Sequence, residues 1–283
     1  MAFPDTRLTL IGRLSSGASE RDWQQFLQDY WGPICRFAAR RARLSAADAE
    51  DVAAKTFESL LSNRLLVRWH EHQGARLRTL LCTVVRHVVA NRARVQAGRE
   101  RLLKEELARG GSTVEAYAAE PIEEPLDTFY AAWVDDLLQG CVDGLMREYH
   151  AAGKGDYFRV LYGRLCEGLT MPGISAALGI KLTDAENYFK AARNGLSKKL
   201  QTALRDHVAR YSDAAGVEAE FDEEWRRLGE FLQQHGGLER AVEDCFRQTG
   251  SGHFPRQGDS FLATRAHLRR VLHPGGADRP AAE

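Results

Sequence analysis

The spacing of apolar residues across residues 76–103 constrains the fold more than any other feature of this sequence. Apolar side chains recur there every three or four residues, which is the period of one face of an α-helix and not the alternation of a β-strand. They are Leu77, Leu80, Leu81, Val84, Val85, Val88 and Val89. The spacing therefore predicts one long helix over residues 76–103 with a single buried stripe.

The same periodicity continues along most of the chain. Together with capping residues at the expected starts, it predicts further helices. They cover two short stretches within residues 4–31, a helix that begins at Pro33, and residues 45–63, 129–150, 155–167, 170–178, 183–206, 217–234, 238–249 and 259–272. Alternating strand patterns are absent from the sequence, so we expect an all-α fold.

An aromatic stripe lies near the N-terminus of the sequence. Its spacing marks one helical face, which is more often core than ligand site; the residues are Trp23, Phe26, Leu27, Tyr30 and Trp31. In the helix expected to begin at Pro33, the apolar residues should face inward and the arginines outward. The inward set is Ile34, Phe37 and Ala38, and the outward set is Arg36, Arg40, Arg41 and Arg43.

Two blocks of opposite charge adjoin each other, although the whole chain has 39 basic and 39 acidic residues and no net charge. Residues 76–104 hold eight arginines and lysines against the single acid Glu100, whereas residues 110–136 hold seven acids and no base. The basic block is either a solvated face or a nucleic-acid surface, because guanidinium groups pair bidentately with phosphates. The acidic block, which contains glycines and prolines, predicts a flexible linker over residues 108–128.

Several classes of function find no support in the sequence. No Gly-rich phosphate loop, metal-ligand spacing or nucleophile beside a base appears, so we expect neither enzymatic activity nor a cofactor. His70 and His72 are two residues apart and do not share a helical face, which argues against zinc. The five cysteines are scattered, and no long apolar run is present, which indicates a cytoplasmic protein without a membrane segment.

A strong helix-start signal opens residues 45–61. Ser45 is a favourable N-cap with Asp48 three residues later, close to a capping box. Asp48, Glu50 and Asp51 place carboxylates in the first turns, where the helix dipole favours negative charge. The segment is either an ordinary capped surface helix or a negative face for a basic partner.

Residues 169–193 follow the plan of a helix-turn-helix motif. Thr170 is expected to cap a short helix with Pro172 in its first turn, Gly179 to make the turn, and Thr183 to cap a second helix. The residues expected to face inward are Ile174, Ala177, Leu178, Ala185, Phe189 and Ala192. The motif is either a DNA reader or an antiparallel helix pair with no role in DNA binding.

The order of these motifs resembles a known family. The aromatic stretch 23–34, the acidic helix 45–61 and the basic segment 74–94 resemble the second conserved region of bacterial RNA polymerase sigma factors of the extracytoplasmic-function class. The segment 169–193 resembles the fourth conserved region of the same factors. The resemblance implies a region-two-like helical domain (1–107), the acidic linker (108–128), a helix-turn-helix domain (129–206) and a helical C-terminal extension with a disordered tail (207–283).

The resemblance also implies a role for individual positions. The implied function is to bind core RNA polymerase, recognise promoter DNA and initiate transcription. Polymerase contacts would fall on the acidic helix, at Asp48, Glu50, Asp51 and Lys55. DNA contacts would fall on a loop whose aromatic residues suit stacking on an unpaired base, on the basic helix and on the recognition helix. They are Trp69, His70, Arg76, Arg78, Arg86, Asn91, Arg92, Arg94, Lys181, Asp184, Asn187, Lys190 and Arg193.

The acidic helix departs from the family pattern in a way that suggests regulation. Ala54 and Lys55 stand where the family has an amide and an acid. Some sigma factors of this class that are short of acids here are activated by threonine phosphorylation within this helix. The resemblance therefore makes Thr56 a candidate site for a Ser/Thr kinase, since a phosphate would restore negative charge. An anti-sigma factor is the other regulator that it suggests.

Two other functions remain open. The chain is compatible with a helix-turn-helix regulator that binds duplex DNA without polymerase, which would require a dimer and a fixed half-site spacing. It is also compatible with a sigma-derived adaptor that has lost promoter recognition and holds partners through residues 207–283, which lie outside the resemblance.

Overall fold

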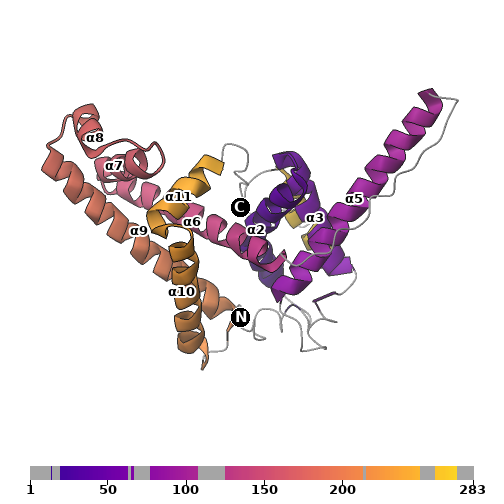
Figure 1. The fold of residues 1–283 in the computed structure, drawn as a ribbon. Helices are drawn as coiled ribbons and strands as arrows, with labels where there is room; N and C mark the ends of the chain where they lie inside the picture. The colour runs from indigo at the N-terminus through magenta and orange to yellow at the C-terminus, as the bar shows by residue number, and fades with distance from the viewer. Residues whose placement is uncertain are drawn as a thin grey trace, which may run out of the picture. The chain divides into compact units, whose positions relative to one another are not determined.

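The fold is all-α across the part of the chain that the structure describes. In a computed structural model of the 283-residue chain, the described residues are 14, 20–62, 65–66, 77–107, 125–212, 215–248 and 259–272. Within these ranges the elements are helices α2, α3 and α5–α12, and no strand occurs (Figure 1). The sequence-based prediction of an all-α protein is therefore confirmed.

The chain divides into two compact units. The N-terminal unit consists of Trp23–Tyr130 together with Phe254–Glu283, and the middle unit consists of Ala131–His253 together with Met1–Asp22. The extension that the sequence suggested as one segment, residues 207–283, is thus shared between the two units. Most of the predicted acidic linker, residues 108–124, lies outside the described residues.

The N-terminal unit is built around α2 (Glu20–Ala42). The expected aromatic core is confirmed, because all five residues of the stripe are buried. The ring of Phe57 from α3 (Ala46–Ser62) lies 5.8 Å from that of Phe26 and 6.2 Å from that of Trp31. On the other side of the core, Phe37 meets Phe129 at 5.5 Å, at the start of α6 (Pro125–Ala151). Partners on several sides make α2 the central helix of this unit.

The prediction that a new helix begins at Pro33 is wrong. Pro33 lies inside α2, which runs through it without interruption. A proline removes one backbone hydrogen bond and disfavours a helix interior by roughly 3 kcal/mol, a cost that tertiary packing offsets here. Residues 30–38 are all buried, so the middle of α2 has no outward face. Arg36, expected on the outside, is buried for the same reason.

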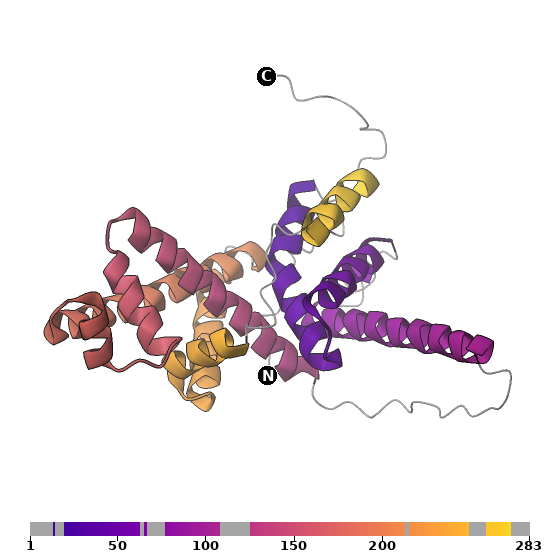
Figure 2. The same cartoon turned by 90° about the horizontal axis from the view of Figure 1, so that it is seen from above.

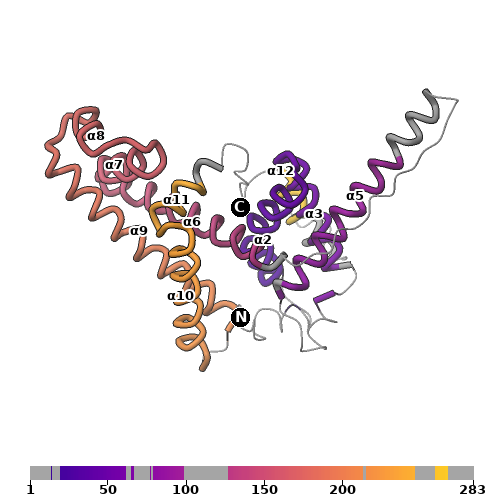
Figure 3. The backbone as a smooth tube through the Cα atoms, in the orientation of Figure 1, coloured from indigo at the N-terminus to yellow at the C-terminus, as the bar shows by residue number. Residues whose placement is uncertain are grey.

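The C-terminal helix α12 (Asp259–Leu272) packs against the first helices of the chain. The ring of Phe261 lies edge-on to Trp31 at 5.4 Å and is fully buried. The Arg265 guanidinium donates a hydrogen bond to the side-chain oxygen of Gln24 at 3.2 Å. α12 lies beside α2 and α3 both in the cartoon seen from above (Figure 2) and in the labelled tube (Figure 3). This helix is therefore part of the core of the N-terminal unit.

The middle unit contains the predicted helix-turn-helix and most of the C-terminal extension. Its elements are α6 from Ala131 onward, α7 (Gly155–Leu165), α8 (Met171–Leu178), α9 (Leu182–Tyr211), α10 (Val217–Gln234) and α11 (Gly237–Gln248). α9 is the long central helix of this unit, and α7, α8 and α10 all pack on it. None of the helices that the structure describes is both long and apolar enough to cross a lipid bilayer.

The packing of α12 yields a stability prediction. Phe261→Ala should lower the free energy of unfolding of the N-terminal unit by about 3–5 kcal/mol, because it empties a buried site against Trp31. The neighbouring Leu262 is 45% exposed, so Leu262→Ala should change stability by no more than about 0.5 kcal/mol. Urea unfolding of the full chain measures both. Equal effects of the two changes would contradict the packing of α12.

Candidate nucleic-acid interface

The helix-turn-helix is fixed by its caps and its turn. The Thr170 hydroxyl accepts a hydrogen bond from the Gly173 N–H at 3.2 Å, so the predicted cap of α8 is confirmed. Gly179 adopts φ = 66°, the left-handed conformation in which a residue with a Cβ is strained. The Ser175 hydroxyl then donates to the Ile180 carbonyl at 2.7 Å and closes the turn.

The start and the inner face of this motif differ from the prediction in two places. α9 begins at Leu182 with Lys181 as its N-cap, so Thr183 lies inside the helix and does not cap it. Ala177, expected to face inward, is exposed. Of the residues of α8, Ile174 alone is buried, in the cluster that α8 forms with α7 and α9. The cluster that holds the helices together consists of Val160, Ile174 and Ala185, with Met171, Leu178, Ile180, Tyr188 and Phe189 packed around it.

One polar face of α9 remains available for contacts. Lys181, Asn187, Lys190 and Arg193 are exposed, as the sequence suggested, and Asp184 is half-buried. Tyr188, on the inner side, stacks on Tyr157 of α7 at 4.1 Å. The stacked rings fix the rotation of α9 about its axis, and the amide and ammonium groups therefore point away from the unit.

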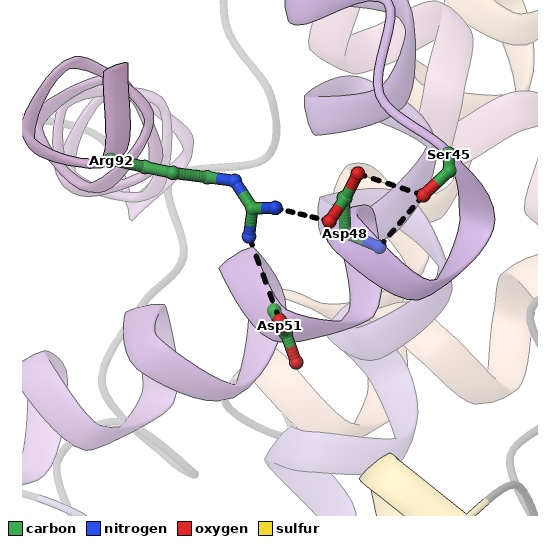
Figure 4. A network of polar contacts seen from close by, with 4 residues as sticks. All are labelled: Ser45, Asp48, Asp51 and Arg92. Atoms are coloured by element: carbon green, nitrogen blue, oxygen red, sulfur yellow. Dashed lines mark hydrogen bonds and ion pairs between the residues drawn. The ribbon is translucent and has the colours of Figure 1, made fainter. Parts of the chain in front are cut away.

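An acidic cluster in the N-terminal unit is organised around Ser45, the predicted N-cap of α3. The Ser45 hydroxyl accepts a hydrogen bond from the Asp48 N–H at 3.2 Å and donates one to the Asp48 carboxylate at 2.8 Å. The Arg92 guanidinium, from α5 (Leu77–Leu107), forms an ion pair with Asp48 and a second with Asp51 at 3.5 Å. Figure 4 shows this network of Ser45, Asp48, Asp51 and Arg92, which joins α3 to α5.

This network brings together residues to which the resemblance gave different roles. Asp48 and Asp51 were expected to contact polymerase, and Arg92 was expected to contact DNA. The Arg92 side chain is only 25% exposed and its charge is neutralised by carboxylates. Arg92 therefore holds two helices together and is a poor candidate for a phosphate contact.

The other residues of α5 are placed differently. Asn91 and Arg94 are exposed and Arg86 is half-buried. Arg94 makes a long hydrogen bond of 3.4 Å from its Nε to the Ala90 carbonyl, which leaves most of its guanidinium facing solvent. Asn91 and Arg94 are thus exposed polar groups of α5 on either side of Arg92, the residue that pairs with α3.

A polar cleft of about 790 Å³ separates the exposed sides of α3 and α5. Asp51, Lys55 and Glu58 line it from α3, and Asn91 and Arg92 line it from α5. A second hollow of about 390 Å³ shares Asn91 with the first and extends past His87 and Arg94. Of the expected polymerase contacts, Asp51 and Lys55 are exposed at this cleft, whereas Asp48 and Glu50 are half-buried.

Thr56 does not lie on the surface that the phosphorylation hypothesis requires. It is fully buried, and its hydroxyl donates to the Val52 carbonyl at 2.8 Å. A kinase needs the hydroxyl in solvent, and a phosphate at this depth would be a charge buried in the core. The folded N-terminal unit therefore argues against Thr56 as a phosphorylation site.

Several predicted DNA contacts fall outside what the structure describes. Trp69, His70 and Arg76 lie outside the described residues. Arg78 belongs to α5, but its side chain is likewise outside the description. Their roles remain predictions from the resemblance.

The described residues bear on metal chemistry through clustered ligands and on thiol chemistry through cysteines with a shifted pKa. They contain no group of three or more His, Cys, Asp and Glu side chains placed to hold a metal ion. Burial raises the pKa of the Cys141 thiol to about 12, and burial likewise raises the pKa of Cys166 to about 12. Both thiols are therefore neutral at physiological pH and unsuited to nucleophilic attack.

Two carboxylates of the C-terminal extension also reach α9, which the sequence did not indicate. Glu239 of α11 pairs with Arg193 at 2.9 Å, and Glu218 of α10 pairs with Arg205. The partners are 46 and 13 positions apart, on different helices, so no periodicity within one helix signals such pairs. Comparison with known proteins adds no relative: no family model, no curated protein and no solved structure matches the chain.

The ion-pair network predicts an energetic coupling between α3 and α5. In a double-mutant cycle, Asp48→Asn and Arg92→Gln should be non-additive by about 0.5–1 kcal/mol, the upper range for pairs that are partly exposed. Arg94→Gln serves as the matched control, and it should show no coupling to Asp48→Asn. Urea unfolding of the full chain gives the four free energies of each cycle. Additive effects of Asp48→Asn and Arg92→Gln would show that the two side chains are not coupled, which would contradict the ion pair.

Proposed function

We propose that this chain is a sigma-type initiation factor: it binds core RNA polymerase in the cytoplasm, recognises promoter DNA and initiates transcription. The observation that carries the proposal is the helix-turn-helix of the middle unit, in which the left-handed Gly179 turn leads into α9 with a polar face exposed. A short helix, a glycine turn and a second helix form the arrangement that places a recognition helix in the major groove.

The exposed groups of α9 have the chemistry for reading a duplex. An asparagine amide can pair bidentately with adenine, so Asn187 is assigned to base recognition. Lys190, one turn further on, is assigned to phosphate or guanine, and Lys181 at the N-cap to the phosphate backbone. Contacts to the phosphate backbone position the helix without reading sequence.

The N-terminal unit supplies two neighbouring surfaces for the same task. α3 carries Asp51 and Lys55 on one side of the polar cleft, and α5 carries Asn91 on the other. Arg94 of α5 lines the adjoining second hollow. We assign the α3 side to core polymerase and residues 91–94 of α5 to promoter DNA, following the order of motifs along the chain. An anti-sigma factor would compete for the α3 side.

A stand-alone regulator and a sigma-derived adaptor are the competing functions. A regulator that binds DNA alone takes most of its affinity from its own phosphate contacts. Here Arg92 and Arg193, two of the arginines expected to contact DNA, are engaged by carboxylates of the same chain. That favours a protein that needs a partner on DNA, either as an initiation factor or as an adaptor.

Polymerase binding tests the proposal directly. The full chain should co-elute with purified bacterial core RNA polymerase in the absence of DNA. Lys55→Glu should tighten this binding about tenfold, because it restores the negative charge that the family presents to a basic surface. Lys198→Glu makes the same charge change on α9 and should leave polymerase binding unchanged. A chain that binds duplex DNA but never core polymerase would instead be a stand-alone regulator.

Recognition by α9 yields a separate prediction. In the complex with core polymerase, Asn187→Ala should reduce discrimination at one base pair of the upstream promoter element by about 1–3 kcal/mol. Gln201→Ala is the control, since residue 201 is also exposed on α9 but about 21 Å further along its axis. Competition binding with single-base promoter variants measures both. Unchanged base preference after Asn187→Ala would exclude this residue as the reader.

A further inference from the structure

The C-terminal extension places a carboxylate on the recognition helix. The Glu239 carboxylate lies 2.9 Å from Nε of Arg193, and the two side chains are 44% and 54% exposed. Arg193 belongs to the same face of α9 as the residues assigned to DNA. The ion pair is therefore at the surface, where a phosphate group could also reach the guanidinium.

The position of Glu239 is set by the fold of the extension. Gly236 and Gly237 adopt φ values of 81° and 90°, and this left-handed pair forms the turn between α10 and α11. α11 then buries Ala241, Val242 and Cys245, and the Cys245 thiol donates to the Asp135 carbonyl of α6 at 3.4 Å. The helix is thus anchored on its inner side, and Glu239 is held at its first turn.

The preceding helix repeats the contact at a second arginine of α9. Glu218 of α10 forms an ion pair with Arg205, and the Arg205 guanidinium lies 4.2 Å over the ring of Phe221. Both helices of residues 217–248 therefore present an acid to an arginine of the long helix. The ring of Phe221 gives Arg205 a second contact, whereas among the described residues no aromatic ring lies against Arg193.

We infer that α11 is an internal competitor of DNA: Glu239 occupies Arg193 and lowers the affinity of α9 for the phosphate backbone. The inference rests on the proposed function and assigns part of its regulation to the extension. A carboxylate and a phosphate both bind a guanidinium group, so Glu239 and the DNA backbone compete for Arg193. Because an exposed pair is weak, DNA can displace Glu239, and the contact sets the affinity of α9 without blocking it.

The test uses the full chain and a labelled DNA duplex of random sequence, on which only backbone contacts matter. Glu239→Gln should tighten binding about two- to fivefold, the range that corresponds to loss of an exposed ion pair. Asp244→Asn removes the same charge from the same helix, where Asp244 pairs with Arg240 at 3.3 Å. This control measures the general effect of deleting an acid and should give a smaller gain.

A second background separates the pair from long-range electrostatics. When Arg193 is replaced by Ala, Glu239→Gln should no longer raise the affinity for the duplex more than Asp244→Asn does, because Glu239 then has no arginine to pair with. Equal gains for the two acid variants, or an advantage that persists without Arg193, would overturn the inference while leaving the proposed function in place. Absence of duplex binding by every variant would also overturn the inference, because α9 would have no backbone affinity for Glu239 to lower. It would leave the proposed function in place, since that function requires core polymerase on DNA.

Discussion

The burial of Trp31 is the contact on which the N-terminal unit depends. Its ring meets Phe57 of α3 and Phe261 of α12, so segments separated by about two hundred residues of sequence share one core. The chain leaves this unit after Tyr130, forms the middle unit and returns with its last helix. This topology makes the C-terminal helix part of the fold of the N-terminal unit. α3, the helix assigned to polymerase, packs against both α12 and α5.

Carboxylates of the chain itself neutralise two arginines that the motifs had assigned to DNA. The sequence has equal numbers of acids and bases, and the structure uses acids to engage arginines that the motifs had assigned to DNA. Arg92 is held by Asp48 and Asp51, and Arg193 by Glu239. The first network is partly covered and joins two helices, whereas the second is exposed and open to exchange. Of the residues that the motifs assigned to DNA, Asn187, Lys190 and Arg94 stay exposed, and the proposed function keeps that assignment for them.

Local patterns in the sequence predicted the helices well, because apolar spacing and capping residues act over a few positions. Thr170, Gly179 and the Ser45–Asp48 capping box behave as expected. Pro33 and Arg36 were misjudged because burial on all sides of α2 outweighs the local preference of proline and charge for exposure. The pairs Asp48–Arg92 and Arg193–Glu239 join residues 44 and 46 positions apart, and no local spacing predicts such contacts. The burial of Thr56, which argues against the phosphorylation hypothesis, likewise depends on the helices packed around α3.

Transcription in a purified system tests the central claim most directly. The full chain and bacterial core RNA polymerase would be incubated with fragments of the genome that encodes it, and RNA start sites would be mapped by sequencing. The account predicts a discrete set of start sites that requires both components and shares two upstream elements, one for each unit of the protein. The account would be contradicted if start sites with core polymerase alone and with the added chain were the same.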